Sequence, residues 1–257
     1  MMQQRKLTTS YIICTPPLSR SLDSQSEAID EAITYSANAI LVAPNGSDAT
    51  TLALERARAA GLKIIYVDSD DSVAAAKTFT TDNKNIGRTA GNEMIAALES
   101  QGSTKGMIGI ISLSTDCIFT LDREVGFSEA FGDTAFEIIE PHYCEGSSDM
   151  AQKIAEELIK CDIVGIFGTF EEAAVGTGAA IKANGNKVVG IGCGLESSSD
   201  TLHALISDGA LLCTIVCNPY EMGYQGMEAA IGVLDGTVTE DGEVIYTGAI
   251  ILTKDDI

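Results

Sequence analysis

Few residues of this sequence are arranged as catalytic or metal-binding groups usually are. The two histidines, His142 and His203, fall in no known motif, and the seven cysteines form no C-x-x-C pair. The odd number of cysteines does not favour a disulfide framework. The chain contains no G-x-S-x-G, P-loop or H-E-x-x-H sequence. We therefore expect neither an enzyme nor a zinc site, and no cofactor.

Two charged residues occupy positions suited to ligand binding. Asp68 ends an apolar run, where its carboxylate can accept two hydrogen bonds from neighbouring hydroxyl groups of a ligand or cap a turn. Arg123 lies in the second turn of an expected helix, and its planar guanidinium suits a polyol or a carboxylate. An ion pair of Arg123 with a nearby acid remains open as an alternative; the acids in question are Asp116, Asp122 and Glu124.

The elements that must position these residues alternate between strands and helices. The short runs are apolar throughout, which is typical of parallel strands covered on both faces. Such runs lie at 11–14, 39–43, 63–68, 107–113, 136–141, 163–167, 187–192, 211–217 and 243–252. Helical patterns lie at 24–37, 47–60, 119–131, 148–160, 172–184 and 219–235, and Asp82 is expected to cap a further helix near Lys84. This order predicts an α/β fold with parallel sheets.

The chain also repeats itself. The stretch from Ala39 to Asp68 has a counterpart about 125 residues later that ends near Gly192. The second half has one further strand and helix, 107–113 and 119–131, with no match in the first half. We therefore predict two similar doubly wound lobes, the first lacking its leading strand and helix. Ligands of parallel sheets bind at the carboxyl ends of the strands, so the lobes are expected to close on a ligand.

Composition excludes several classes of partner. The 257 residues carry a formal charge of −21, with only 16 Lys and Arg residues, and these form no basic cluster. Nucleic acid and anionic membranes are therefore not expected partners. No apolar run approaches the ~20 residues of a membrane-spanning helix. The N-terminus has no apolar stretch of a signal peptide, and taken alone it predicts a cytoplasmic chain.

Several segments together resemble one protein family. In order and spacing, residues 11–257 are similar to the periplasmic sugar-binding proteins of bacterial ABC importers, the ribose-binding-protein-like type I group. The similar segments are "GLKIIYVDSD" (61–70), "FTTDNKNIGRTAGNEMIAAL" (79–98), "LDREVGF" (121–127), "NPYEMGYQGMEAAIGVLDG" (218–236) and "GAIILTKDDI" (248–257). The family's first strand, first helix and signal peptide have no match in this sequence.

The resemblance implies a fold, a function and partners. It implies an N-terminal lobe at 1–104, incomplete but with its returning helix, and a C-terminal lobe at 105–257 with crossing strands and the tail. It implies a monomer that clamps a monosaccharide or related metabolite and delivers it to an ABC-type permease. The location implied is extracytoplasmic, in the periplasm or as a cell-surface lipoprotein.

The resemblance also implies ligand contacts, some of them altered. Phe170 stands where the family usually has a polar pair and can stack on a sugar ring; Phe119 can do the same or belong to the core. Gly192 or Cys193 replaces a usual Asp, and Cys217 replaces a usual Gln. The ligand is therefore less polar than ribose, or held differently, or bound weakly. The full predicted set is Asp68, Ser69, Asp116, Phe119, Arg123, Phe170, Gly192, Cys193 and Cys217.

Two other functions share this fold. One is a sensing module that reports ligand occupancy to a receptor. The other is the effector domain of a lactose-repressor-type regulator, which would carry a helix-turn-helix ahead of the first strand; this sequence shows none. Fold alone does not separate these functions.

Overall fold

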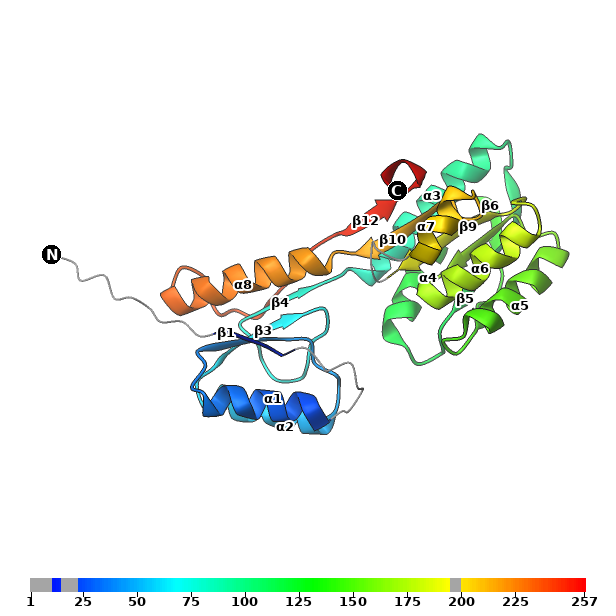
Figure 1. The fold of residues 1–257 in the computed structure, drawn as a ribbon. Helices are drawn as coiled ribbons and strands as arrows, with labels where there is room; N and C mark the ends of the chain where they lie inside the picture. Colours follow the sequence, from blue (N-terminus) through cyan, green and yellow to red (C-terminus); the bar gives the residue numbers. More distant parts are fainter. Residues whose placement is uncertain (1–10, 15–22, 195–199) are drawn as a thin grey trace. The chain divides into compact units, whose positions relative to one another are not determined.

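The structure, a computed structural model, describes residues 11–14, 23–194 and 200–257. The chain divides into two compact units (Figure 1): unit 1 comprises Met1–Thr81 and Asn218–Thr247, and unit 2 comprises Asp82–Cys217 and Gly248–Ile257. The chain thus passes between the units three times. This division differs from the boundary expected at residue 104, because the helix near residue 84 groups with unit 2 and the helix after residue 218 groups with unit 1.

Unit 1 is built on a five-stranded parallel sheet in the order β1-β2-β3-β4-β11. Helices α1 and α2 pack together on one side of the sheet, and α8 contacts β2, β3 and β4 (Figure 1). The elements are β1 (Tyr11–Cys14), α1 (Asp23–Thr34), β2 (Ala39–Val42), α2 (Asp48–Ala59), β3 (Lys63–Val67), β4 (Lys77–Thr80), α8 (Pro219–Asp235) and β11 (Glu243–Tyr246).

Unit 2 is built on a seven-stranded sheet in the order β12-β10-β9-β8-β5-β6, with β7 also paired to β5. All these pairs are parallel except β10 with β12. Its helices are α3 (Asn83–Ser100), α4 (Ile118–Ala130), α5 (Ser148–Lys160), α6 (Glu171–Ala183), α7 (Asp200–Ser207) and a 3-10 turn (Lys254–Asp256). Its strands are β5 (Lys105–Ser112), β6 (Ala135–Ile138), β7 (His142–Tyr143), β8 (Gly165–Gly168), β9 (Val189–Gly194), β10 (Cys213–Cys217) and β12 (Ala249–Leu252).

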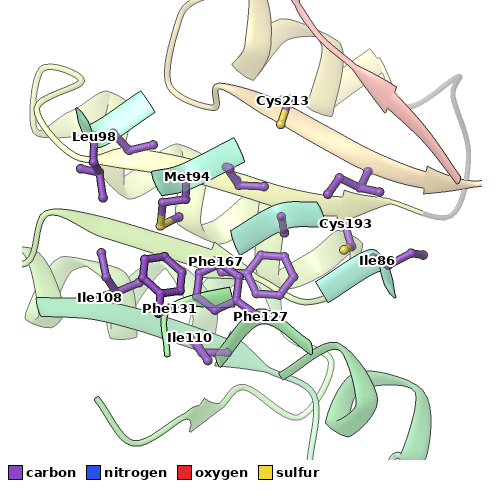
Figure 2. Packing of buried hydrophobic residues seen from close by; sticks show 14 of the residues in the cluster. Ile86, Met94, Leu98, Ile108, Ile110, Phe127, Phe131, Phe167, Cys193 and Cys213 are labelled. Carbon is purple, nitrogen blue, oxygen red and sulfur yellow. The ribbon is translucent and has the colours of Figure 1, made fainter. Parts of the chain in front are cut away.

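Alternate strand residues of unit 2 enter two apolar layers, as buried parallel strands require. The layer under α3 and α4 contains Phe127 and Phe167, whose rings stack with centroids 4.5 Å apart (Figure 2). Strand β5 contributes Ile110 to this layer, and β8 contributes Phe167. The layer under α5 and α6 contains the neighbouring residues of these two strands, Ile111 and Ile166. Burial of these side chains is the main stabilising contribution to the unit.

Helices α3 and α4 touch backbone to backbone. A Cβ added at Gly87 of α3 would lie 1.9 Å from the carbonyl oxygen of Arg123, and one added at Gly126 of α4 would lie 1.8 Å from that of Lys84. Only glycine lets two helices approach this closely. The two glycines therefore fix where α4, and with it Arg123, lies against α3.

The predicted α/β architecture is confirmed, and three details of the prediction are corrected. The expected closing strand at 243–252 is two strands in different sheets, since β11 pairs with β4 and β12 pairs with β10. The break falls at Gly248, whose φ of 79° suits glycine. Helix α7 was not predicted. In the unit 1 sheet β1 pairs with β2 as β5 pairs with β8 in unit 2, so β1 takes the position of the strand that the repeat had predicted to be missing.

Candidate functional site

Polar side chains collect at the carboxyl edge of the unit 2 sheet. Ser112 ends β5, Thr169 follows β8 directly, and Cys217 ends β10. These strands are parallel, so their carboxyl ends share one edge of the sheet. Ser112 and Thr169 are fully buried, and Arg123 and Glu124 of α4 are nearly so. Buried polar groups at this edge are the natural starting point for a ligand site.

The Arg123 guanidinium is the centre of this cluster. Its Nε donates to Asn83 Oδ1 at 2.8 Å, and its Nη1 donates to the carbonyl oxygen of Thr169 at 2.8 Å. Nη2 lies 3.9 Å from the Sγ of Cys217. The ion pair with Asp116, Asp122 or Glu124, considered as an alternative, is absent from the part of the chain that the structure describes. Arg123 thus joins α4 to the ends of β8 and β10 and the start of α3.

The neighbouring Glu124 belongs to a second set of hydrogen bonds. Tyr143 donates to its Oε2 at 3.5 Å, while its buried Oε1 has no partner among the described residues. Ser112 Oγ and Thr169 Oγ1 share a hydrogen bond of 2.9 Å beside it. Burial raises the pKa of Glu124, and hydrogen bonding from Ser112 and Tyr143 acts in the opposite direction. The environment of Glu124 therefore disfavours its charge.

The three predicted residues near the ends of β9 and β10 have different surroundings. Cys217 is half-buried beside Arg123. Cys193 is buried in the apolar layer under α3, and this burial raises the pKa of its thiol to about 12, although Arg123 opposes the shift. A Cβ added at Gly192 would lie 2.5 Å from Cβ of Ala174 in α6. A larger residue at 192 would therefore need α6 to move.

The two phenylalanines and Asp116 flank the cluster. Phe170 is the N-cap of α6, follows Thr169 and packs against the α5–α6 layer. Phe119, in the first turn of α4, is half-exposed, so it is not a core residue. Asp116 accepts a hydrogen bond from Ser114 Oγ at 2.6 Å. Both aromatic rings remain predicted ligand contacts.

Asp68 and Ser69 lie at the corresponding carboxyl edge of the unit 1 sheet, after β3. Asp68 has a φ of 68°, and its amide donates to the Phe79 carbonyl oxygen at 2.8 Å. Ser69 Oγ donates to the carbonyl oxygen of Pro44 at 2.9 Å. No hydrogen bond or ion pair occupies the Asp68 carboxylate within the described residues. Left-handed backbone is uncommon at non-glycine residues, and Asp and Asn adopt it more readily than most.

Sequence reasoning missed part of the unit 2 cluster. Asp82 caps α3 as expected, accepting from the Asn85 amide at 2.9 Å, but its neighbour Asn83 holds Arg123. Ser112 and Thr169 were also missed, although each is a polar residue at the end of an apolar run. That feature could have identified both.

Two hollows lie at the opposite, amino edges of the sheets. One of about 460 Å³ in unit 1 is lined by Lys63, Glu240 and Asp241, and one of about 230 Å³ in unit 2 is lined by Val189, Leu212 and Lys254, among others. Lys63 is already paired with Glu240 at 2.6 Å. Neither hollow gathers buried polar groups as the Arg123 cluster does, so the cluster remains the candidate site.

Two α/β units with polar side chains gathered at the carboxyl edges of their sheets define a ligand-binding protein. A family model described as "Periplasmic binding protein domain" matches residues 5–237, and the chain belongs to this family. The family is one of solute-binding proteins, which supports the expectation that the chain is not an enzyme. Membership also implies an extracytoplasmic location. No helix in the described part of the chain is long and apolar enough to cross a membrane.

Individual relatives agree with the family. The chain is 25% identical over 219 residues to the ribose import binding protein RbsB of Bacillus subtilis, covering 82% of this chain and 68% of that protein. A carbohydrate transporter solute-binding protein from Agrobacterium radiobacter, solved with D-arabinose, is 27% identical with a TM-score of 0.73, covering 92% and 81% of the two chains. The fold also matches a sugar-binding protein of Bacillus halodurans, with a TM-score of 0.81 at 21% identity, covering 92% and 84%.

Proposed function

We propose that this protein is a solute-binding protein that binds a small sugar or related metabolite and delivers it to an ABC-type permease. The proposal includes a location in the periplasm or at the cell surface as a lipoprotein, action as a monomer, and no chemical change to the ligand. It is supported by the names of the relatives, an import binding protein for ribose and a transporter protein solved with D-arabinose.

The observation that carries the proposal is the buried Arg123 cluster. Arg123 offers five N–H donors in a fixed plane, and three of them are engaged. A hydroxyl-bearing ligand at this edge can accept hydrogen bonds from the remaining two N–H groups. The rings of Phe119 and Phe170 can stack on the ring of the ligand. In unit 1, Asp68 and Ser69 are the proposed contacts. The Asp68 carboxylate, for which the described residues provide no partner, can accept hydrogen bonds from ligand hydroxyls.

Delivery to a permease requires that the conformation of the protein differs between the ligand-free and the ligand-bound state. A ligand shifts a conformational equilibrium only by its differential affinity for the two states. We propose that the permease recognises the ligand-bound state of the two units.

Thermal unfolding in the presence of candidate ligands tests the function. The panel holds monosaccharides, polyols and small furanosides at ~1 mM. A ligand with micromolar affinity stabilises the native state by ~4 kcal/mol at that concentration, which raises the Tm by several degrees. A cooperative melt that no member of the panel shifts would count against sugar binding.

A further inference from the structure

Helix α8 of unit 1 occupies the same place in its unit as helix α3 in unit 2. Each helix follows a strand of the other unit, begins at a side-chain N-cap, Asp82 or Asn218, and covers one face of its own sheet. Counted from these N-caps, Gly87 of α3 and Gly223 of α8 stand at the same position. The two helices therefore present corresponding faces, which can be compared residue by residue.

The face of α3 that contains Gly87 binds another helix. A Cβ added at Gly87 would lie 1.9 Å from the carbonyl oxygen of Arg123 in α4, so the two backbones touch at this crossing point. Beside it, Lys84 and Arg88 of α3 pair with Glu129 of α4 at 2.6 and 2.8 Å. A glycine at the crossing and opposite charges beside it thus characterise a helix-binding face in this protein.

The corresponding face of α8 carries no helix among the described residues. No atom lies within 4 Å of a Cβ added at Gly223. Large apolar side chains follow one another along this face: Tyr220, Tyr224 and Ile231 are 76%, 51% and 43% exposed. The two tyrosine rings lie nearly parallel, with their centroids 6.2 Å apart. Exposed apolar residues that adjoin one another indicate a surface that binds another molecule.

The segment of unit 1 that corresponds to α4 is too short to form such a helix. In unit 2, α4 lies between β5 and α5, which residues 113–147 separate. Their counterparts in unit 1, β1 and α1, are separated by residues 15–22. These are eight residues, fewer than the 13 residues of α4. Residues 15–22 therefore cannot cover α8 as α4 covers α3.

The charges of α8 determine which kind of helix fits this face. Helix α8 contains Glu221, Glu228 and Asp235 but no lysine, arginine or histidine. A second copy of α8 would bring only further acids to the interface, and like charges repel. A helix with lysine or arginine at this place would instead pair with Glu228, and its cation could also lie over a tyrosine ring. The complementary partner is therefore basic.

We propose that α8 binds a helix of a partner protein, one that carries glycine or alanine at the crossing point and lysine or arginine beside it. The partner helix crosses α8 at Gly223 as α4 crosses α3 at Gly87. Its basic residue takes the place that Glu129 holds on α4, next to Tyr220 and Tyr224. The inference goes beyond the proposed function, because it concerns a helix surface of unit 1 and does not depend on the solute.

Two labelled peptides with the sequence of α4, residues 118–130, test this against the full chain. One keeps Glu129 and the other carries Glu129→Lys, and both are stapled as helices on the side opposite Gly126. Fluorescence anisotropy should show that the lysine peptide binds, with a Kd at least about fivefold lower than that of the glutamate peptide. Failure of the lysine peptide to bind, or equal binding of the two peptides, overturns the proposal.

Variants of the full chain identify the surface that the lysine peptide binds. Gly223→Leu should weaken binding about tenfold, because the new side chain fills the crossing point, while the open space around Gly223 lets the chain fold as before. Tyr224→Ala should also weaken binding. The control Tyr35→Ala removes another exposed tyrosine of unit 1, 68% exposed, and should leave the Kd unchanged. Binding that neither α8 variant weakens overturns the assignment to α8.

Analytical ultracentrifugation of the chain alone tests the rival occupant, a second copy. The proposal predicts a monomer, because two α8 helices would bring their acids together. A dimer that Gly223→Leu converts to monomers would assign this face to self-association and overturn the proposal.

Discussion

Replacing Gly87 with alanine should weaken unit 2 by separating α3 from α4. The new Cβ would lie 1.9 Å from the Arg123 carbonyl oxygen, so the helices must move apart by roughly 1 Å or more. Overpacking of this kind costs about 1–3 kcal/mol, and the gain in helix propensity from glycine to alanine returns at most about 1 kcal/mol. Because the added Cβ meets backbone atoms that cannot rotate away, the cost should lie in the upper part of this range, about 2–3 kcal/mol, and the free energy of unfolding should fall by about 1–2 kcal/mol.

A matched control lies on α8. Gly223 follows its N-cap by the same five positions as Gly87, and no atom lies within 4 Å of a Cβ added there. Gly223→Ala should leave stability unchanged or raise it by up to about 1 kcal/mol. Urea unfolding of both variants, followed by circular dichroism, gives the comparison. A Gly87→Ala protein as stable as the unaltered chain would refute the close α3–α4 contact and its role in placing Arg123.

Three further predictions concern other parts of the fold. Phe127→Ala removes a fully buried ring that stacks on Phe167, and should lower the free energy of urea unfolding by about 3–5 kcal/mol. The Lys77 ammonium lowers the pKa of Asp241 to about 2, so Asp241→Asn should be less stable than the unaltered chain at neutral pH. That difference should shrink as the pH falls from 3.8 toward 2 in a melting series and be absent below 2, where the carboxylate is protonated in both the folded and the unfolded state. Iodoacetamide at pH 8 should label the exposed Cys161 but not the buried Cys193, which peptide mass spectrometry would show; labelling of both would contradict the burial.

The elements were predictable because each leaves a local pattern. Apolar runs mark the parallel strands, and capping residues such as Ser47 and Ser147 mark helix starts. The division into units was less predictable, because α3 and α8 are assigned by the surfaces they pack against. The two halves of the predicted closing strand, β11 and β12, likewise pair in different sheets. This division could not be predicted locally, because it depends on their pairing partners, β4 and β10, which lie far away in the sequence.

The site was predictable only in part, for a similar reason. Arg123 stood out by residue type and position. Its environment did not, because a backbone carbonyl oxygen at Thr169 carries no sequence signature and Asn83 resembled part of a helix cap. Gly192 was identified as a changed position, but only the packing of Ala174 against it shows that a larger residue has no room there.

The central claim is that the Arg123 cluster at the carboxyl edge of the unit 2 sheet binds the solute. The most direct measurement is the Kd of the best ligand from the panel, by isothermal titration, for the unaltered chain, Arg123→Gln and Arg88→Gln. Arg88 is a matched control because its guanidinium, also in unit 2, is exposed and pairs with Glu129 at 2.8 Å. The account predicts a Kd at least about tenfold weaker for Arg123→Gln and unchanged for Arg88→Gln. An Arg123→Gln protein that folds and binds as tightly as the unaltered chain would contradict it.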